Sequence, residues 1–223
     1  MLKFLKRLLE LTYGSKEAEV DKVLDSLETE DSLESIFERL KKDGLIGDYN
    51  EERLKVNFEN RLKIATKAIQ LGGDVEKICK KLDWKEFENF VFKILEVNAY
   101  NVRKHYRFEY RNKKYEFDIL AYNDLFMLCI DCKHWKYGGQ RSKLLEAARM
   151  QLDRVIAFSK LKKEMERIRK EKKLRIFPIV LTLMDVSFKE LNGVPVVSIL
   201  KFNDFLYRLS PTTDEFVRVT TEC

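Results

Sequence analysis

Apolar side chains recur at spacings of three and four through the first eighty residues, which is the repeat of amphipathic helices. A longer helix is expected over 51–71, up to the Gly72–Gly73 pair, and a short one in the run DVEKICKKL. Before them, the pattern predicts short helices in the runs LKFLKRLLEL, AEVDKVLDSL and SLESIFERLKKDGLI, the last opened by the capping-box pattern D31-S-L-E34.

Residues 1–81 are therefore expected to form a helical N-terminal domain. Within it, the run IFERLKKDGLI is similar to the later helix of a winged helix, which suggests a role in DNA binding. The alternative is that these helices serve packing or dimerisation.

The pattern changes after residue 83. The run WKEFENFVFKILEVN predicts a strongly amphipathic helix, and a second, long helix is expected over 141–173. Between them lie three β-rich runs, and after them come two apolar strands and a final helix. This order of helix, three strands, helix and strand predicts an α/β fold with a mixed sheet for residues 82–223. The strand runs read YNVRKHYRFEY, KKYEFDILAY, LFMLCIDCKHW, RIFPIVLTLM and VPVVSI, and the final helix reads FNDFLYRL.

Charge separates the two regions further. Residues 1–81 carry a net charge of −1, whereas residues 82–223 carry +7 of the chain's total of +6. A basic domain attracts polyanions, and nucleic acid is the common one. A solvated, lysine-rich surface is the alternative, also for the run at 160–175, which holds nine Lys and Arg against three acids.

Other features of the composition bound the class of protein. No run approaches 18 consecutive apolar residues, so no transmembrane helix is expected. The four cysteines form no disulfide framework, which favours a cytoplasmic protein. Glutamine is scarce while lysine and glutamate are plentiful, a composition that suits a thermophile.

The third β-rich run contains two overlapping patterns, C129-x-x-C132 and D131-x-K133. Residues three apart on a strand point to opposite faces, so the two thiols cannot turn toward one zinc ion, and no second ligand pair exists in the sequence. Cys132 is therefore expected to fill the core. Asp131 and Lys133 are two apart and share the other face.

Residues Asn123–Asp124 separate the second and third β-rich runs and suit a two-residue hairpin turn. That turn would place Asp118 opposite Cys129 and Glu116 opposite Asp131. Carboxylates this close repel one another, and a hard divalent cation, Mg²⁺ or Mn²⁺, would relieve the repulsion. A surface ion cluster is the alternative. The opposite face of the hairpin would carry Phe117, Ile119, Ala121, Phe126, Leu128, Ile130 and Cys132.

These residues resemble a known signature. The run D118…D131-C-K133 is similar to the D-x(n)-(D/E)-x-K signature of the PD-(D/E)xK nucleases, although Phe117 stands where the family often has Pro. The preceding W84-K-E-F-E88 resembles the "eFE" helix of their Mrr-type restriction endonucleases and archaeal relatives. The resemblance covers residues 83–185. It implies a restriction endonuclease-like core (helix, three-stranded antiparallel meander, helix, strand) and Mg²⁺-dependent hydrolysis of phosphodiester bonds in DNA.

The resemblance also implies roles by position. Asp118, Asp131 and the backbone carbonyl of Cys132 look like metal ligands, and Glu88 matches the helix acid that holds a metal or its water. Lys133 looks like the group that orients or activates the attacking water. Gln151 and Arg154 resemble accessory positions beside the site, or are ordinary helix-surface residues, and Glu116 is a reserve carboxylate. Nucleic-acid contacts are expected from Trp135, Lys136, Arg141 and Lys143, although Trp135 could instead pack beneath the site.

The sequence leaves other interpretations open. The fold could serve a nucleic-acid-binding module without cleavage, or an RNA-processing nuclease, because nothing in the sequence separates DNA from RNA. It does not distinguish one metal from two. A homodimer, with the N-terminal helices at its contact, is an expectation drawn from the size of such nucleases.

Overall fold

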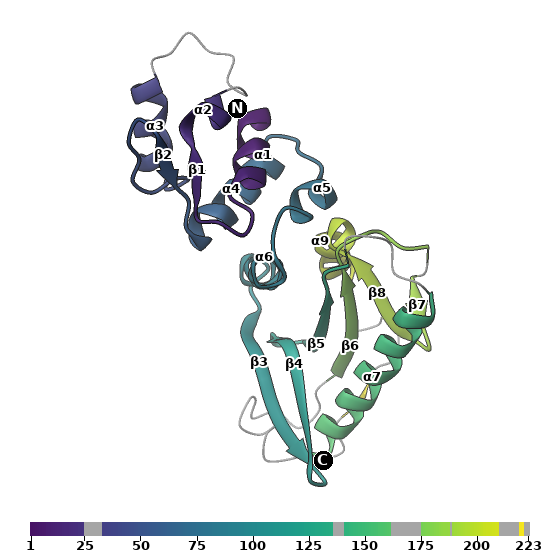
Figure 1. The fold of residues 1–223 in the computed structure, drawn as a ribbon. Helices are drawn as coiled ribbons and strands as arrows, with labels where there is room; N and C mark the ends of the chain where they lie inside the picture. The colour runs from purple at the N-terminus through teal and green to yellow at the C-terminus, as the bar shows by residue number, and fades with distance from the viewer. Residues whose placement is uncertain (25–32, 136–140, 162–174, 188, 210–218, 221–223) are drawn as a thin grey trace. The chain divides into compact units, whose positions relative to one another are not determined.

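Figure 1 shows the computed structural model, which describes residues 1–24, 33–135, 141–161, 175–187, 189–209 and 219–220. The chain divides into two compact units, Met1–Phe90 and Val91–Cys223. The division falls inside helix α6 (Trp84–Val97), whereas the sequence-based boundary at 81/82 lies in front of this helix. Among the described residues, no helix is both long and apolar enough to cross a membrane.

The first unit contains more strand than its helical pattern predicts. Strands β1 (Glu17–Glu19) and β2 (Arg53–Lys55) pair antiparallel, each with only its middle side chain buried. The helix expected over 51–71 therefore begins only at Phe58, where Asn57 forms a capping box with Asn60. The helices of this unit are α1 (Leu2–Leu11), α2 (Val20–Leu24), α3 (Leu33–Lys42), α4 (Phe58–Gln70) and α5 (Val75–Cys79).

The start of the run AEVDKVLDSL forms β1 rather than helix, and only Val20–Leu24 is helical among its described residues. The capping box predicted at residues 31–34 lies partly outside the described residues. The winged-helix-like role of this unit stays a prediction.

The second unit is built on a seven-stranded mixed sheet in the order β3-β4-β5-β6-β8-β7, with β9 paired to β6 (Figure 1). Its first three strands form an antiparallel meander, and β5–β6 and β6–β8 pair parallel, which confirms the α/β class with a mixed sheet. The strands are β3 (Asn101–Tyr110), β4 (Lys113–Tyr122), β5 (Phe126–Lys133), β6 (Arg175–Thr182), β7 (Glu190–Leu191), β8 (Val194–Ser198) and β9 (Val219–Thr220).

Helix α7 (Arg141–Ser159) connects β5 to β6 and packs on the sheet through two buried clusters. One joins its Val155 and Phe158 to the β3–β4 strands, and the other joins Leu144 and Ala148 to β6 and β8. The long helix expected over 141–173 ends at Ser159, and residues 162–174, with most of the basic run, lie outside the described residues. Helix α9 (Ile199–Arg208) is the predicted final helix.

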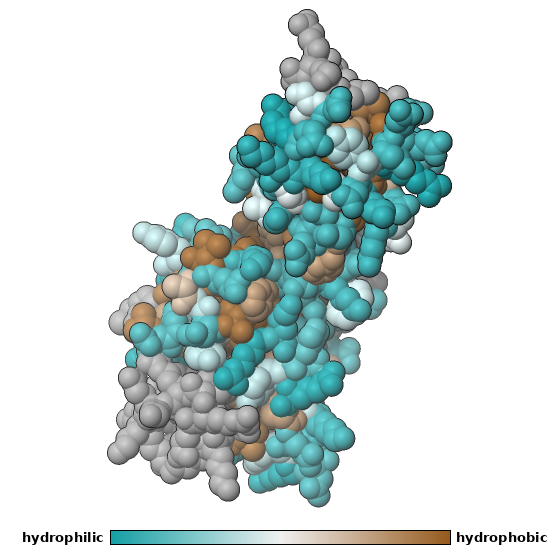
Figure 2. Space-filling view, turned by 90° about the vertical axis from the view of Figure 1, so that its left-hand side faces the viewer, coloured by the Kyte–Doolittle hydropathy of each residue, from teal (hydrophilic) through white to brown (hydrophobic). Residues whose placement is uncertain are grey.

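Most of the buried side chains in the two units are apolar. The central strands β5 and β6 are buried along nearly their whole length, as expected for strands with parallel neighbours. Hydrophilic residues dominate the face of the molecule seen in Figure 2, with apolar residues in smaller patches between them.

Candidate active site

The turn between β4 and β5 sets the geometry of the site. Asn123 closes it: its backbone N–H donates to the carbonyl of Phe126, and its side-chain oxygen accepts from the N–H groups of Leu125 and Phe126. The two turn residues are therefore Asp124 and Leu125, not Asn123 and Asp124. The pairing shifts by two residues, so that Leu120 lies opposite Cys129 and Ile119 opposite Ile130.

Strands β4 and β5 separate at the two candidate carboxylates. The ladder ends with Ile119 opposite Ile130, and one further step in this register places Asp118 opposite Asp131. At this point the Cys132 N–H donates to Asp118 Oδ2 at 2.7 Å, so a side chain takes the place of a ladder partner. The predicted juxtaposition of Asp118 with Cys129, and of Glu116 with Asp131, is wrong because the turn lies one residue later than predicted.

The neighbouring strand is also irregular beside Asp118. In the β3–β4 register His105 falls opposite Asp118, where the ladder has a gap, and His105 has a φ of 49° in the left-handed region. Phe117 then shares a buried cluster with Leu120 and Cys129, whereas regular alternation predicted it on the opposite face. Backbone irregularities of this kind cost free energy and concentrate at functional sites.

Asp131 lies at the centre of a charged cluster and is only 4% exposed. Lys133 Nζ lies 2.7 Å from its Oδ2, and Arg154 Nη1 donates to its Oδ1 at 3.0 Å. The same Arg154 nitrogen lies 3.0 Å from the side-chain oxygen of the fully buried Gln151, which in turn donates to the Cys129 carbonyl at 2.7 Å. The accessory positions Gln151 and Arg154 are thus brought to the predicted carboxylate.

The second carboxylate, Asp118, is held in an environment that disfavours its charge. Burial raises the pKa of Asp118, and the negative charge of Asp131 raises it further. The Cys132 N–H, Lys133 and Arg154 lower the pKa of Asp118 but do not cancel the increase. Two carboxylates in this arrangement repel each other, which is the condition that a bound cation relieves.

A divalent cation fits this donor set. Asp131 Oδ2 is buried, lies 2.7 Å from the Lys133 ammonium, and accepts no hydrogen bond from the described residues. Such an atom has a lone pair without a donor, and hard cations prefer carboxylate oxygen. Within the described part of the chain, no three His, Cys, Asp or Glu side chains gather closely enough to hold a metal. The two aspartates would therefore leave most ligand positions to water, as Mg²⁺ commonly does.

Three other predicted residues, Glu116, Cys132 and Glu88, need separate description. Glu116 faces Arg107, with its Oε2 2.7 Å from the guanidinium, and His105, so it is part of a separate ion cluster. Cys132 is only half-buried, and the thiol that fills the core is Cys129, because β5 buries both faces up to Ile130. Glu88 is buried on the part of α6 that belongs to the first unit.

The expected nucleic-acid contacts are only partly described. Trp135 packs against the buried cluster under the first half of α7, which agrees with its packing interpretation. Arg141 and Lys143 are exposed on the first turn of α7. Lys136 lies outside the described residues.

A buried ion pair in the first unit was not predicted. Arg61 Nε lies 2.6 Å from Glu86 Oε1, and both side chains are almost fully buried. Glu86 also forms a reciprocal capping box with Asp83 at the start of α6. The spacing D83-x-x-E86 indicates the capping box in the sequence, but not the ion pair with Arg61. The first glutamate of W84-K-E-F-E88 therefore has a structural role.

Comparisons with known proteins find distant similarities. No family model matches the chain. A curated relative, an uncharacterized protein of Archaeoglobus fulgidus, is 28% identical over 134 residues, which are 60% of this chain and 96% of the relative. The solved structure of a protein of unknown function, AF1548, gives a TM-score of 0.35 at 15% identity over 50% of this chain and 55% of its own. Protein VC1899 from Vibrio cholerae gives a TM-score of 0.35 at 12% identity. The match covers 92% of this chain and 49% of VC1899. This chain thus spans about half the length of the two solved proteins.

Proposed function

We propose that this protein is a metal-dependent nuclease of the PD-(D/E)xK type, with a restriction endonuclease-like core, that hydrolyses phosphodiester bonds in DNA. The observation that carries the proposal is the cluster at the end of the β4–β5 ladder, where Asp118 and Asp131 lie together beside Lys133. The half-satisfied Asp131 carboxylate and the raised pKa of Asp118 both indicate a place for a cation.

The chemistry of the substrate explains why these groups belong together. A phosphodiester is anionic and repels an attacking nucleophile, so positive charge at the scissile phosphate is required. A divalent cation held by Asp118 and Asp131 would supply such charge and make water more acidic. Lys133 adds a cation that reaches the same carboxylate. Arg154, fixed through Gln151 to the β5 backbone, holds Asp131 in place from the helix side.

The proposed reaction is an in-line attack by water on the phosphorus. Lys133, which is about one quarter exposed, can reach solvent and the negative charge that develops on the phosphate. The reserve carboxylate Glu116 has no part in this step because Arg107 and His105 engage it. The role of Glu88 as the helix acid stays a prediction of the resemblance, because Glu88 belongs to the first unit.

A second candidate function, a nucleic-acid-binding module, is supported by a different observation. Lys133 and Arg154 already neutralise Asp131, so the cluster could be a closed ion network in a nucleic-acid-binding module that does not cleave. The two candidates differ in whether a metal binds to Asp131.

The deciding experiment compares wild type with Asp131→Asn and Lys133→Met on plasmid, linear, branched and single-stranded DNA and on RNA, with Mg²⁺, Mn²⁺ or chelator. We expect each variant to lose cleavage about 100-fold or more. Matched controls are Asp185→Asn and Lys201→Met, which change the same charges in an exposed ion pair. Metal should also raise the melting temperature of wild type but not of Asp131→Asn.

The outcomes separate the candidates. DNA binding without metal-dependent cleavage, and without the metal-dependent rise in melting temperature, would favour the binding module. Cleavage of RNA alone would place the enzyme in RNA processing. Equal cleavage by wild type and Asp131→Asn would show that the site lies elsewhere.

A further inference from the structure

The β3–β4 hairpin continues past the candidate site as a two-stranded ribbon. From Phe117 back to the turn at Arg111–Asn112 the two strands pair with each other without a break, and β4 no longer pairs with β5 there. Figure 1 shows these strands extending beyond β5. At about 3.3 Å per residue, the six residues from Asp118 to Asn112 span about 20 Å.

Charge is concentrated on this ribbon. Residues 101–116 hold six Lys and Arg against two Glu, a net charge of +4. Arg111 and Lys113 at the tip lie over the rings of Tyr110 and Tyr115 at 5.2 and 5.1 Å. Neither they nor Lys114 form an ion pair with a described carboxylate. Each cation lies over one tyrosine ring while its charged group stays exposed at the surface.

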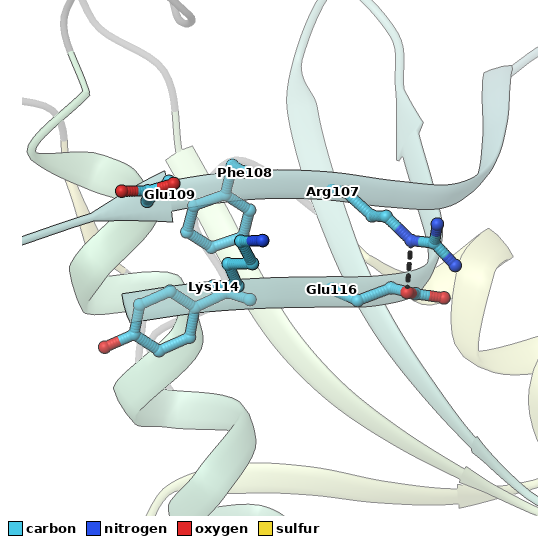
Figure 3. Close-up of a pocket in the computed structure, with 6 residues that line it drawn as sticks. Arg107, Phe108, Glu109, Lys114 and Glu116 are labelled. Atoms are coloured by element: carbon cyan, nitrogen blue, oxygen red, sulfur yellow. Dashed lines mark hydrogen bonds and ion pairs between the residues drawn. The ribbon is translucent and has the colours of Figure 1, made fainter. Parts of the chain in front are cut away.

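The two faces of the ribbon differ. One face packs on the end of α7 through Phe108, Phe117 and Phe158. The other carries the cross-strand pairs Arg107–Glu116 and Glu109–Lys114. Figure 3 shows these four side chains along the hairpin, and a pocket of about 650 Å³ is lined by them and by Phe108 and Tyr115 of the packed face. On this second face Arg107 donates to Glu116 at 2.7 Å, while Glu109 and Lys114 are exposed beside the cations of the tip.

We propose that this ribbon is an arm that lies in the major groove of a B-form DNA duplex. The B-form major groove, about 12 Å wide, admits a two-stranded β-ribbon, and Arg or Lys and Glu can read guanine and cytosine edges there. The tip cations then contact phosphates and set the register. The inference rests on the proposed function and narrows its substrate from DNA of any form to B-form duplex DNA.

RNA fits the ribbon less well. The major groove of an A-form duplex is deep and too narrow for side chains to read. The arm would therefore favour DNA over a double-stranded RNA of the same sequence. Its tip would contact the duplex about 20 Å from the reacting phosphate, or about six base pairs at 3.4 Å each.

A triple variant of the tip tests the proposal. Arg111→Asn keeps a residue that tolerates the left-handed φ of 50° at this position, and Lys113→Gln and Lys114→Gln remove the neighbouring charges. The matched control, Lys93→Gln with Lys189→Gln and Lys201→Gln, removes three exposed lysine charges from other parts of the second unit. Circular dichroism verifies that both variants fold.

Binding of a fluorescent 25-base-pair duplex is measured by anisotropy in chelator, so that cleavage plays no part. We expect the tip variant to lose about 10- to 100-fold in affinity at 0.1 M salt and to reduce the slope of log K against log salt by about three, since each phosphate contact contributes about 0.9. The control variant should keep the wild-type slope. Wild type should bind the DNA duplex more tightly than the RNA duplex.

Three results would overturn the arm: wild type that binds no duplex, equal slopes for the tip and control variants, or equal affinity of wild type for both duplexes. Because β3 is an edge strand, it could instead pair with a second copy of the chain, and light scattering tests this. A tip variant that changes the oligomeric state but not the affinity for DNA would also overturn the proposed arm. Tip-dependent binding without metal-dependent cleavage would contradict the proposed nuclease activity and leave the arm standing.

Discussion

Each unit of the protein buries a carboxylate beside a guanidinium, and the two clusters differ in how completely their polar atoms are satisfied. In the first unit all three side-chain nitrogens of Arg61 donate, to Glu86, to Thr12 and to the carbonyls of Leu9 and Lys81. The second Glu86 oxygen also accepts from the Asp83 N–H. This pair is closed and serves the packing of α1, α4 and α6.

The cluster in the second unit remains open. Asp131 has two cations beside it, yet its Oδ2 accepts no hydrogen bond from the described residues, and a second carboxylate, Asp118, lies next to it. Lys133 and Arg154 are 26% and 21% exposed, whereas the Arg61 side chain is only 4% exposed. A buried pair with every polar atom satisfied indicates a structural role, whereas two close carboxylates, one with an oxygen that accepts no hydrogen bond, indicate a place for a ligand.

The largest expected effect is the difference in stability lost when Arg61 or Arg154 is substituted. Arg61→Met leaves Glu86 charged and buried, and we expect it to lower the free energy of unfolding by about 3–5 kcal/mol. Arg154→Met should cost about 1 kcal/mol or less, because its partner keeps Lys133 and the site reaches solvent. Urea denaturation measures both, with the exposed Arg53→Met as control. Equal losses for Arg61→Met and Arg154→Met would contradict the comparison.

A smaller effect concerns the pH dependence of stability. The pKa of Asp118 is raised in the folded protein, so its ionisation destabilises the fold; this cost is absent below the unfolded pKa and fully present above the folded one. We therefore expect Asp118→Asn, which can still accept from the Cys132 N–H, to melt at a higher temperature than wild type at neutral pH. The difference should shrink as the pH falls through the folded pKa.

Asp185 provides a control of opposite sign. The Lys201 ammonium lowers the pKa of Asp185, so its charge stabilises the fold above the unfolded pKa, and this contribution is lost as the pH falls. Asp185→Asn should melt slightly lower than wild type at neutral pH. A stabilised Asp185→Asn, or a destabilised Asp118→Asn, would reverse the assignment of the two carboxylates.

The smallest expected effect is a difference in reactivity among the thiols of Cys79, Cys129 and Cys132. Burial raises the pKa of Cys79 to about 12 and the pKa of Cys129 well above its usual value, while Cys132 is only half-buried at the site. In a Cys223→Ser background, iodoacetamide at pH 8 should modify Cys132 first and the other two only on unfolding. Peptide mass mapping identifies the site, and labelling of Cys129 as fast as Cys132 would show that the end of β5 is open.

Local pattern was sufficient for much of this protein. The period of two places Asp131 and Lys133 on one face of a strand, and the period of 3.6 identifies α6, α7 and α9, because both depend only on neighbouring residues. The same reasoning failed at residues 51–57, where apolar spacing suggested helix. Residues Arg53–Lys55 form a strand because they pair with β1, and the helix begins only at Phe58 because Asn57 caps it.

The register of the β4–β5 hairpin could not be read from spacing. Turn-residue preference favoured Asn123–Asp124, whereas the structure turns at Asp124–Leu125, where the side chain of Asn123 accepts from two N–H groups and caps the turn from outside it. That single step moves Asp118 from Cys129 to Asp131, and Glu116 away to Arg107.

The sequence by itself therefore determined the chemical groups of the candidate site, the strands that carry them and the basic character of the second unit. Only the tertiary structure decided which carboxylates meet, that Arg154 and Gln151 close on Asp131, and that Arg61 is matched by Glu86. Side-chain direction along one element follows from backbone periodicity, whereas contacts between elements follow from turns, caps and burial that involve residues far apart in the chain.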